Sequence, residues 1–215
     1  MHEQDREPTS HERHSGQPWD ASYRHGPAPW DIGTAQPAVT RLIAAGAFTG
    51  EVLDVGCGTG DNTVALAATG LHVLGVDVAE TALAIARRTA TDRGLTVDFA
   101  LADALHLERL HRRFDTVLDS ALFHTFDTTE QAAYAASLTT ATTPDATVHL
   151  LCFSDTGPNP GPHPISRAAI TAAFASADWH IAAIEPSTLR TRFDDASPAW
   201  LATIHRRPRT PAASS

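Results

Sequence analysis

Residues Val52–Gly60 read Val-Leu-Asp-Val-Gly-Cys-Gly-Thr-Gly, an apolar run followed by glycines at alternate positions. The apolar residues predict a strand buried in a sheet, and the residues after Gly60 predict a helix. Glycine lets the chain turn sharply beneath a ligand, because a side chain at that point would block the ligand's approach. The stretch therefore predicts a strand, a turn and a helix that hold a nucleotide-like ligand.

The spacing of these glycines separates two classes of cofactor. A nicotinamide or flavin fingerprint has glycine at its first, third and sixth positions, but counting from Gly56 the sixth position is Asp61. Glycine falls instead on the first, third and fifth positions, Gly56, Gly58 and Gly60. Led by Asp54, this arrangement resembles motif I of the class I S-adenosylmethionine-dependent methyltransferases.

Strand and helix patterns alternate along most of the chain. This alternation indicates an α/β fold with a Rossmann-like, doubly wound and mostly parallel seven-stranded sheet. The segment between the last two strands is too short for a helical crossover, so we expect an antiparallel hairpin at one edge of the sheet. Strands are expected at residues 51–55, 71–77, 95–101, 114–119, 147–153, 179–184 and 200–205, and helices at residues 62–68, 79–93, 129–140 and 166–175.

The chain is expected to form one domain over residues 17–206. Residues 1–16 and 207–215 are polar and have almost no apolar side chains, which predicts two disordered tails. Between residues 17 and 37 aromatic residues alternate with prolines, which is unusual for a linker. Because such rings must be buried, this segment predicts an N-terminal helical lid on the sheet.

Composition excludes several classes of partner. The net charge is -9 and no lysine is present, so nucleic acid is not an expected partner. No apolar run approaches the roughly 20 residues of a membrane span, and the charged N-terminus does not resemble a signal peptide. The two cysteines are far apart and His2, His11 and His14 match no ligand pattern, so no metal is expected. We expect a cytoplasmic protein with no obligate protein partner.

The methyltransferase resemblance implies S-adenosylmethionine as the cofactor and assigns further residues to it. Asp77 ends the second predicted strand, about twenty residues after the first glycine, where a carboxylate accepts both ribose hydroxyls. Asp103 and Ala104 occupy the place of the adenine contacts. The alternative is that these aspartates only end strands or cap helices, which the ordered set of acids disfavours. The implied cofactor contacts are Trp30, Asp54, Gly56, Cys57, Gly58, Gly60, Asn62, Asp77, Val78, Asp103, Ala104, Asp119 and Ser120.

The segment Asp119–His124 follows the fourth predicted strand, at the sheet edge where ligands of open α/β folds collect. It lacks the Asn/Asp-Pro-Pro-aromatic motif of amino-group DNA methyltransferases. A histidine with a near-neutral pKa can remove a proton from a hydroxyl, thiol or ring nitrogen, which makes His124 a candidate catalytic residue. A packing or capping histidine is an equally supported alternative.

The N-terminal aromatic segment sharpens the resemblance. Trp19–Tyr23 and Pro29–Gly33, followed by Gln36 and Pro37, resemble a recurrent entry segment of small-molecule methyltransferases related to thiopurine methyltransferase. Together with Phe114–Phe126, they resemble the bacterial heterocyclic toxin methyltransferases over roughly residues 17–206. This resemblance implies methyl transfer to an oxygen, nitrogen or sulfur atom of a small aromatic heterocycle, such as a hydroxyquinolone or quinol.

The same resemblance gives the aromatic residues their roles. Trp30 would lie against the methionine end of the cofactor, where a ring face attracts a sulfonium cation. Trp19, Tyr23 and Phe123 would wall a flat acceptor site, with Tyr23 and His124 as the catalytic residues. The alternative is that these rings only pack an N-terminal helix onto the sheet.

Two rival functions stay open at the level of the sequence. A non-catalytic S-adenosylmethionine-binding or sensing protein would keep the same fold, because a fold does not guarantee chemistry. A nicotinamide oxidoreductase shares the sheet and the ribose acid but conflicts with the glycine spacing. The proline- and glycine-rich loop at residues 154–164 is expected to lie beside the pocket in all three cases.

Overall fold

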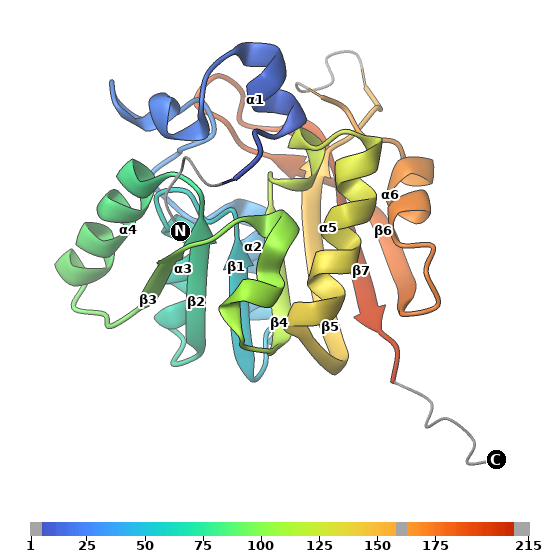
Figure 1. The fold of residues 1–215 in the computed structure, drawn as a ribbon. Helices are drawn as coiled ribbons and strands as arrows, with labels where there is room; N and C mark the ends of the chain where they lie inside the picture. The colour runs from blue at the N-terminus through green and yellow to red at the C-terminus, as the bar shows by residue number, and fades with distance from the viewer. Residues whose placement is uncertain (1–5, 158–162, 209–215) are drawn as a thin grey trace.

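The computed structural model describes residues 6–157 and 163–208 as an α/β fold with a seven-stranded sheet (Figure 1). The strand order is β3-β2-β1-β4-β5-β7-β6, and the first five are parallel. The strands are β1 (Glu51–Val55), β2 (His72–Asp77), β3 (Asp98–Leu101), β4 (Phe114–Ser120), β5 (Thr142–Phe153), β6 (Trp179–Leu189) and β7 (Ser197–Arg206). The predicted fold class is confirmed.

Helices cover both faces of the sheet because the parallel strands bury side chains on both sides. In β1, Val52 packs with Val39 and Leu66 on one face, whereas Leu53 and Val55 join the larger cluster on the other. The α-helices are α1 (Ser10–Ser15), α2 (Pro37–Ala44), α3 (Asp61–Ala67), α4 (Glu80–Asp92), α5 (Thr128–Ala141) and α6 (Arg167–Ala173). The 3₁₀ helices are η2 (Trp19–Tyr23), η3 (Ala104–Leu110) and η4 (Phe123–Thr125).

The antiparallel edge forms as the sequence predicts, although β7 inserts between β5 and β6. It pairs antiparallel with both neighbours, Leu201 facing Leu151 on one side and Glu185 on the other. Four strand boundaries differ from the predictions by three residues or more. β5 begins earlier, at Thr142, β3 begins later, at Asp98, β6 continues to Leu189, and β7 begins earlier, at Ser197. Among the residues described, no helix is long and apolar enough to cross a membrane.

The N-terminal segment corrects one prediction. Residues 6–16 are not a disordered tail, because α1 begins at a capping box of Thr9 and Glu12 and docks on the start of α5. The buried Glu12 carboxylate accepts hydrogen bonds from the backbone N–H groups of Thr9 (2.9 Å) and Trp19 (3.0 Å) and pairs with Arg6. The amide of Ser10 donates to Glu130 at 2.6 Å. Residues 1–5 and 209–215, which the tail predictions include, lie outside the described residues.

This topology brings the ends of three parallel strands to one edge of the sheet. Val55 of β1 lies beside Asp119 of β4 and Val76 of β2 in the hydrogen-bonded register. Figure 1 shows α1 and the N-terminal segment crossing above this edge. A covered carboxyl edge is the usual ligand site of such a sheet.

Candidate functional site

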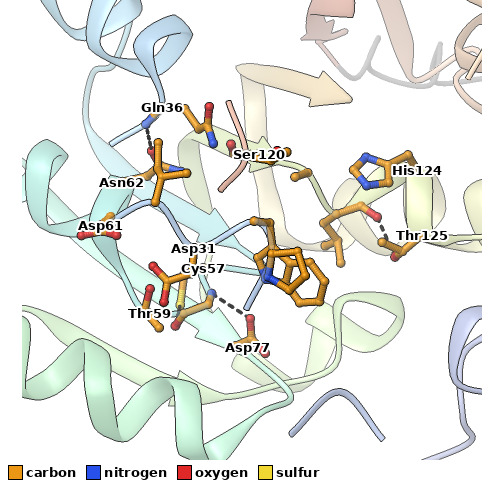
Figure 2. Close-up of a pocket in the computed structure, with 18 of the residues that line it drawn as sticks. Asp31, Gln36, Cys57, Thr59, Asp61, Asn62, Asp77, Ser120, His124 and Thr125 are labelled. Atoms are coloured by element: carbon orange, nitrogen blue, oxygen red, sulfur yellow. Dashed lines mark hydrogen bonds between the residues drawn. The ribbon is translucent and has the colours of Figure 1, made fainter. Parts of the chain in front are cut away.

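A cavity of about 490 Å³ lies at this edge, beneath the N-terminal segment. Its wall comes from the ends of the parallel strands with the turns that follow them, residues 11–36, residues 120–125, His163 and the β6–β7 connection. Figure 2 shows Cys57, Asn62 and Asp77 lining it, with His124 on the side away from Asn62. The predicted site residues that line the cavity are Trp19, Tyr23, Trp30, Gly56, Cys57, Gly58, Asn62, Asp77, Val78, Ala104, Ser120 and His124.

The glycine turn brings bare backbone to the cavity. Gly58 has φ +53°, and a Cβ built on it would stand 3.1 Å from the Tyr23 hydroxyl. Gly60 has φ +80° and ends the turn at the start of α3, where an added Cβ would stand 2.8 Å from Ala86. Gly60 does not line the cavity, so its role is close packing of the helix and not the predicted ligand contact.

Asp77 is held at the end of β2 by two backbone amides. One carboxylate oxygen accepts from Gly58 at 2.8 Å and the other from Ala79 at 2.9 Å (Figure 2). Burial raises the pKa of Asp77 above its ordinary value, and these two hydrogen bonds oppose that shift. The carboxylate thus lies fixed between the glycine turn and the cavity, beside Val78.

Two further acids lie beneath the turn without lining the cavity. Asp54 accepts a 2.5 Å hydrogen bond from the Thr63 hydroxyl, and Asp119 accepts from the amides of Leu122 (3.0 Å) and Phe123 (3.2 Å). Burial raises the pKa of each carboxyl to about 7. They organise the backbone below the cavity, and the direct cofactor contact predicted for them is not seen in its lining.

Asp103 likewise stands outside the lining of the cavity. Its side chain accepts from the amide of Leu105 at 2.9 Å and so caps η3, which was the alternative interpretation of this aspartate. The neighbouring Ala102 and Ala104 do line the cavity. An apolar surface for a flat ring therefore exists here, while one oxygen of the predicted amine partner caps η3.

The imidazole of His124 is 6% exposed and stands 4.7 Å, centroid to centroid, from the ring of Phe153. Its Nδ1 has no hydrogen-bond partner among the described residues. Burial, reinforced by His163 and His11, lowers the pKa of His124 to about 3. The sequence suggests a near-neutral pKa, but the buried ring is neutral at physiological pH and so offers one nitrogen as an acceptor.

Phe123 corrects a second prediction, because it does not wall the cavity. Its ring is fully buried and lies 6.4 Å from Tyr134 and 6.2 Å from Phe174, centroid to centroid, in the core below. Successive residues of a 3₁₀ helix project about 120° apart, since it has three residues per turn. Placing His124 at the cavity therefore sends Phe123 into the core.

The predicted aromatic lid forms from three rings. Trp19 and Trp30 meet edge to face at 5.7 Å between centroids, and the Trp30 indole N–H donates to the Tyr23 hydroxyl at 2.9 Å. Burial, followed by the nearby charge of Asp77, raises the pKa of Tyr23 well above its ordinary value. Tyr23 thus keeps its proton and positions Trp30, which does not suit the predicted role in proton transfer.

Sequence reasoning missed two histidines at the cavity. His11 stacks on Trp19 at 4.3 Å between centroids, and its Nδ1 is 3.3 Å from Nε2 of His163. Both rings line the cavity, yet one was placed in a tail and the other in a loop whose residues 158–162 lie outside the described residues. No local sequence pattern predicts that these histidines reach the cavity. The position of His11, for example, is set by the contacts of its segment through Glu12 and with the start of α5.

Gln36 belongs to the entry segment of the family resemblance, which gives it no role, and in the structure it joins distant parts of the cavity wall. Its side-chain amide donates to the carbonyl of Arg190 at 2.8 Å, and its side-chain oxygen accepts from the amide of Arg190 at 3.0 Å. The backbone amide of Gln36 donates to the Asn62 side chain at 2.9 Å (Figure 2). The residue therefore ties the β6–β7 connection to the start of α3.

The residues present fit an adenosyl sulfonium ligand. The glycine turn exposes backbone, Asp77 supplies a fixed carboxylate for ribose hydroxyls, and Ala102 and Ala104 supply an apolar surface. The indole of Trp30 adds a ring face of the kind that attracts a cation. The fold and this donor set together are those of a class I methyltransferase.

Comparisons with known proteins agree with this class. Residues 52–145 match a family described as a methyltransferase domain. The chain is 36% identical, over 170 residues, to 2-heptyl-1-hydroxyquinolin-4(1H)-one methyltransferase of Mycobacteroides abscessus, covering 77% of this chain and 74% of that relative. It is 29% identical, over 147 residues, to thiocyanate methyltransferase 1 of Brassica oleracea, covering 67% and 65%.

Solved structures extend the match across the fold. A structure from work on the conversion of a disulfide bond into a thioacetal group during echinomycin biosynthesis has a TM-score of 0.82 and 36% identity, over 90% of this chain and 92% of that one. Magnesium protoporphyrin IX methyltransferase of Synechocystis with bound S-adenosylmethionine has a TM-score of 0.61 and 24% identity, over 79% and 76%. The chain belongs to the S-adenosylmethionine-dependent methyltransferases.

Proposed function

We propose that this methyltransferase transfers the methyl group to a small aromatic heterocycle, with a hydroxyquinolone-like hydroxyl as the acceptor. The observation that carries the proposal is the neutral imidazole of His124 at a cavity whose lid is made of aromatic rings. The 36% identical relative that acts on a hydroxyquinolone supports the same class of acceptor.

The chain's own residues divide the work between the two sides of the cavity. Bound S-adenosylmethionine supplies an electrophilic methyl group. Asp77 and the bare backbone of the glycine turn hold the adenosyl part, and Trp30 lies where it can face the sulfonium. The covering rings exclude water and align the acceptor, so placement supplies much of the rate.

His124 acts on the acceptor through its unprotonated nitrogen. A pKa of about 3 leaves this nitrogen free at neutral pH to accept a hydrogen bond from an acceptor O–H or ring N–H. That hydrogen bond orients the nucleophilic atom. The ring is a weak base, so its nitrogen takes the proton only as the bond to the methyl group forms and makes the oxygen strongly acidic. A neutral, buried ring suits an acidic heterocyclic hydroxyl, whose proton is easily given up.

A sulfur acceptor is the second candidate, because the relatives include a thiocyanate methyltransferase and the structure from work on thioacetal formation. The geometry of the cavity favours the heterocyclic hydroxyl over it. A thiol is a weak hydrogen-bond donor, so it gains less from the free nitrogen of His124 than an O–H or N–H does.

The test is a panel of acceptors incubated with the protein and S-adenosylmethionine, read by mass spectrometry. We expect the 1-hydroxyquinolin-4(1H)-ones to gain one methyl group faster than quinols or thiols. The Asp77→Ala variant is the control and should lose turnover with every compound. Methylation of thiols alone would select the sulfur acceptor. Tight cofactor binding without any product would select the non-catalytic alternative, and NAD(P)H binding that S-adenosylmethionine does not displace would select the oxidoreductase.

A further inference from the structure

One large apolar side chain stands out of the packed structure at the mouth of the cavity. Phe193 is 85% exposed and is the sole large hydrophobic residue that is exposed among residues 6–157 and 163–208. It lies in the connection between β6 and β7, and its ring lines the same cavity as His124 and Trp30. A ligand in this cavity that reaches Phe193 would remove its side chain from water.

Hydrogen bonds fix the turn that carries this ring. The Thr191 hydroxyl accepts from the amides of Phe193 (3.2 Å) and Asp194 (3.0 Å), and the Thr191 amide donates to the Asp194 carbonyl at 2.7 Å. The Asp194 carboxylate in turn accepts from the Ala196 amide at 3.0 Å and the Ser197 hydroxyl at 2.7 Å. The turn therefore presents Phe193 outward in a closed, hydrogen-bonded conformation.

Two contacts also fix the turn against the aromatic lid. The amide of Arg192 donates to the carbonyl of Pro29 at 2.9 Å, and Gln36 holds the backbone of Arg190. Pro29 is the residue before Trp30, and it too lines the cavity. The Phe193 ring is thus positioned relative to the lid that covers the acceptor.

We propose that Phe193 selects acceptors that carry an apolar substituent, which leaves the ring-binding part of the cavity and packs on its side chain. This inference rests on the proposed function and names the class of acceptor: heterocycles with an alkyl tail. The gain comes from removing the apolar surfaces of both the tail and the ring from water. A bare heterocycle leaves Phe193 exposed and gains nothing from it.

The experiment compares two acceptors, 2-heptyl- and 2-methyl-1-hydroxyquinolin-4(1H)-one, with four proteins. In the wild type we expect a roughly tenfold lower KM for the heptyl compound, because the tail buries the equivalent of about two methylenes on the ring. Phe193→Ala should raise that KM about tenfold, with kcat and the KM of the methyl compound unchanged. Phe193→Leu should fall between. Arg192→Ala, in the same turn but outside the lining of the cavity, should behave as wild type.

The outcomes separate the two proposals. Turnover of both compounds with no effect of Phe193→Ala on the heptyl KM overturns the role of Phe193 and leaves the proposed function standing. If turnover is absent, calorimetric dissociation constants for the two compounds, measured with S-adenosylhomocysteine present, replace KM in the same comparison. Binding of neither compound overturns both proposals.

Two further measurements test whether a lipid surface or a second copy of the chain covers Phe193 instead. Sedimentation with phosphatidylcholine and phosphatidylglycerol vesicles that Phe193→Ala abolishes would assign the ring to a lipid surface. A dimer in sedimentation velocity that the same variant dissociates would assign it to a second copy of the chain. Either result overturns the acceptor-tail proposal. Unchanged circular dichroism and S-adenosylmethionine affinity will show that Phe193→Ala is folded.

Discussion

The two sides of the cavity are built in different ways. The cofactor side uses the ends of neighbouring strands, where the amides of Gly56 and Cys57 donate to one carbonyl of β2, that of Val76, at 2.8 and 2.9 Å. The acceptor side uses segments as far apart in sequence as His11 and Ser197. The first is therefore set by a short motif and the sheet register, whereas the second depends on long-range contacts that differ between proteins sharing the sheet.

The largest expected effect concerns the buried acids beneath the cofactor side. Because the folded-state pKa of Asp119 is raised to about 7, the folded protein keeps a proton that the unfolded chain loses above about pH 4. Its contribution to the free energy of unfolding is therefore full below pH 4 and lost as the pH rises through 7. Asp119→Asn stays neutral, so its stability relative to wild type should rise by about 4 kcal/mol between pH 4 and pH 8. Urea unfolding measures this, and a pH-independent difference would contradict it.

The next largest effect is expected from a variant that disrupts the cofactor side alone. Asp77→Ala removes the acceptor of two amide hydrogen bonds together with the ribose partner, and should weaken S-adenosylmethionine binding about a hundredfold or more, since hydrogen bonds to charged groups contribute most. Isothermal titration calorimetry measures the affinity. Asp103→Ala is the comparison, because Asp103 caps η3 outside the lining of the cavity, and it should change affinity far less. Equal losses for the two variants would show that the cavity is wrongly assigned.

Replacing His124 should affect turnover and leave cofactor binding unchanged, the reverse of what Asp77→Ala does to binding. His124→Ala should lower kcat for a hydroxyquinolone roughly tenfold to hundredfold while leaving S-adenosylmethionine affinity unchanged. Because burial lowers the pKa of His124 to about 3, protonation removes its acceptor nitrogen only as the pH falls toward 3. The kcat of the wild type should therefore show no histidine-dependent fall between pH 8 and pH 5. A limb near pH 6.5 that disappears in His124→Ala would refute this assignment.

The smallest expected effect comes from replacing a glycine by alanine, which can strain the backbone or fill space that the cofactor needs. Gly58 and Gly46 both have positive φ, at +53° and +67°, but an added Cβ meets Tyr23 only at Gly58. Both alanine variants should therefore lose about 1 kcal/mol of stability, whereas Gly58→Ala alone should also raise the dissociation constant of S-adenosylmethionine, by roughly fivefold. Thermal unfolding and calorimetry measure the two quantities. A binding defect in Gly46→Ala would mean that backbone strain between α2 and β1, away from the cavity, also reaches the cofactor.

The difference between the two sides also decides what the sequence predicts. The stretch around Asp54, with strand, turn and helix in consecutive residues, is enough to predict the sheet edge and the cavity beneath Trp30. The position of His124 against Phe123 is not predictable from spacing, because a three-residue 3₁₀ helix decides which ring faces inward. Asp103 could serve as a ligand contact or a cap, and only its backbone geometry distinguishes these roles.

The N-terminal residues show why composition alone can predict disorder wrongly. Residues 6–16 are polar enough to predict disorder. Composition cannot show, however, that one buried carboxylate accepts hydrogen bonds from several parts of the segment. Glu12 does this for Thr9, Trp19 and Arg6, so the segment gains order from satisfied hydrogen bonds in place of apolar area. The position of His11 follows from that order, which is why the sequence could not reveal it.

The double hydrogen bond between Gln36 and Arg190 couples positions 154 residues apart. Breaking it would free the N–H and C=O of Arg190 and the side chain of Gln36, whose own backbone amide donates to Asn62 at the start of α3. Gln36 therefore ties the connection that carries Phe193 to the helix that follows the glycine turn, so replacing this one residue would remove the hydrogen-bonded link between the two sides of the cavity.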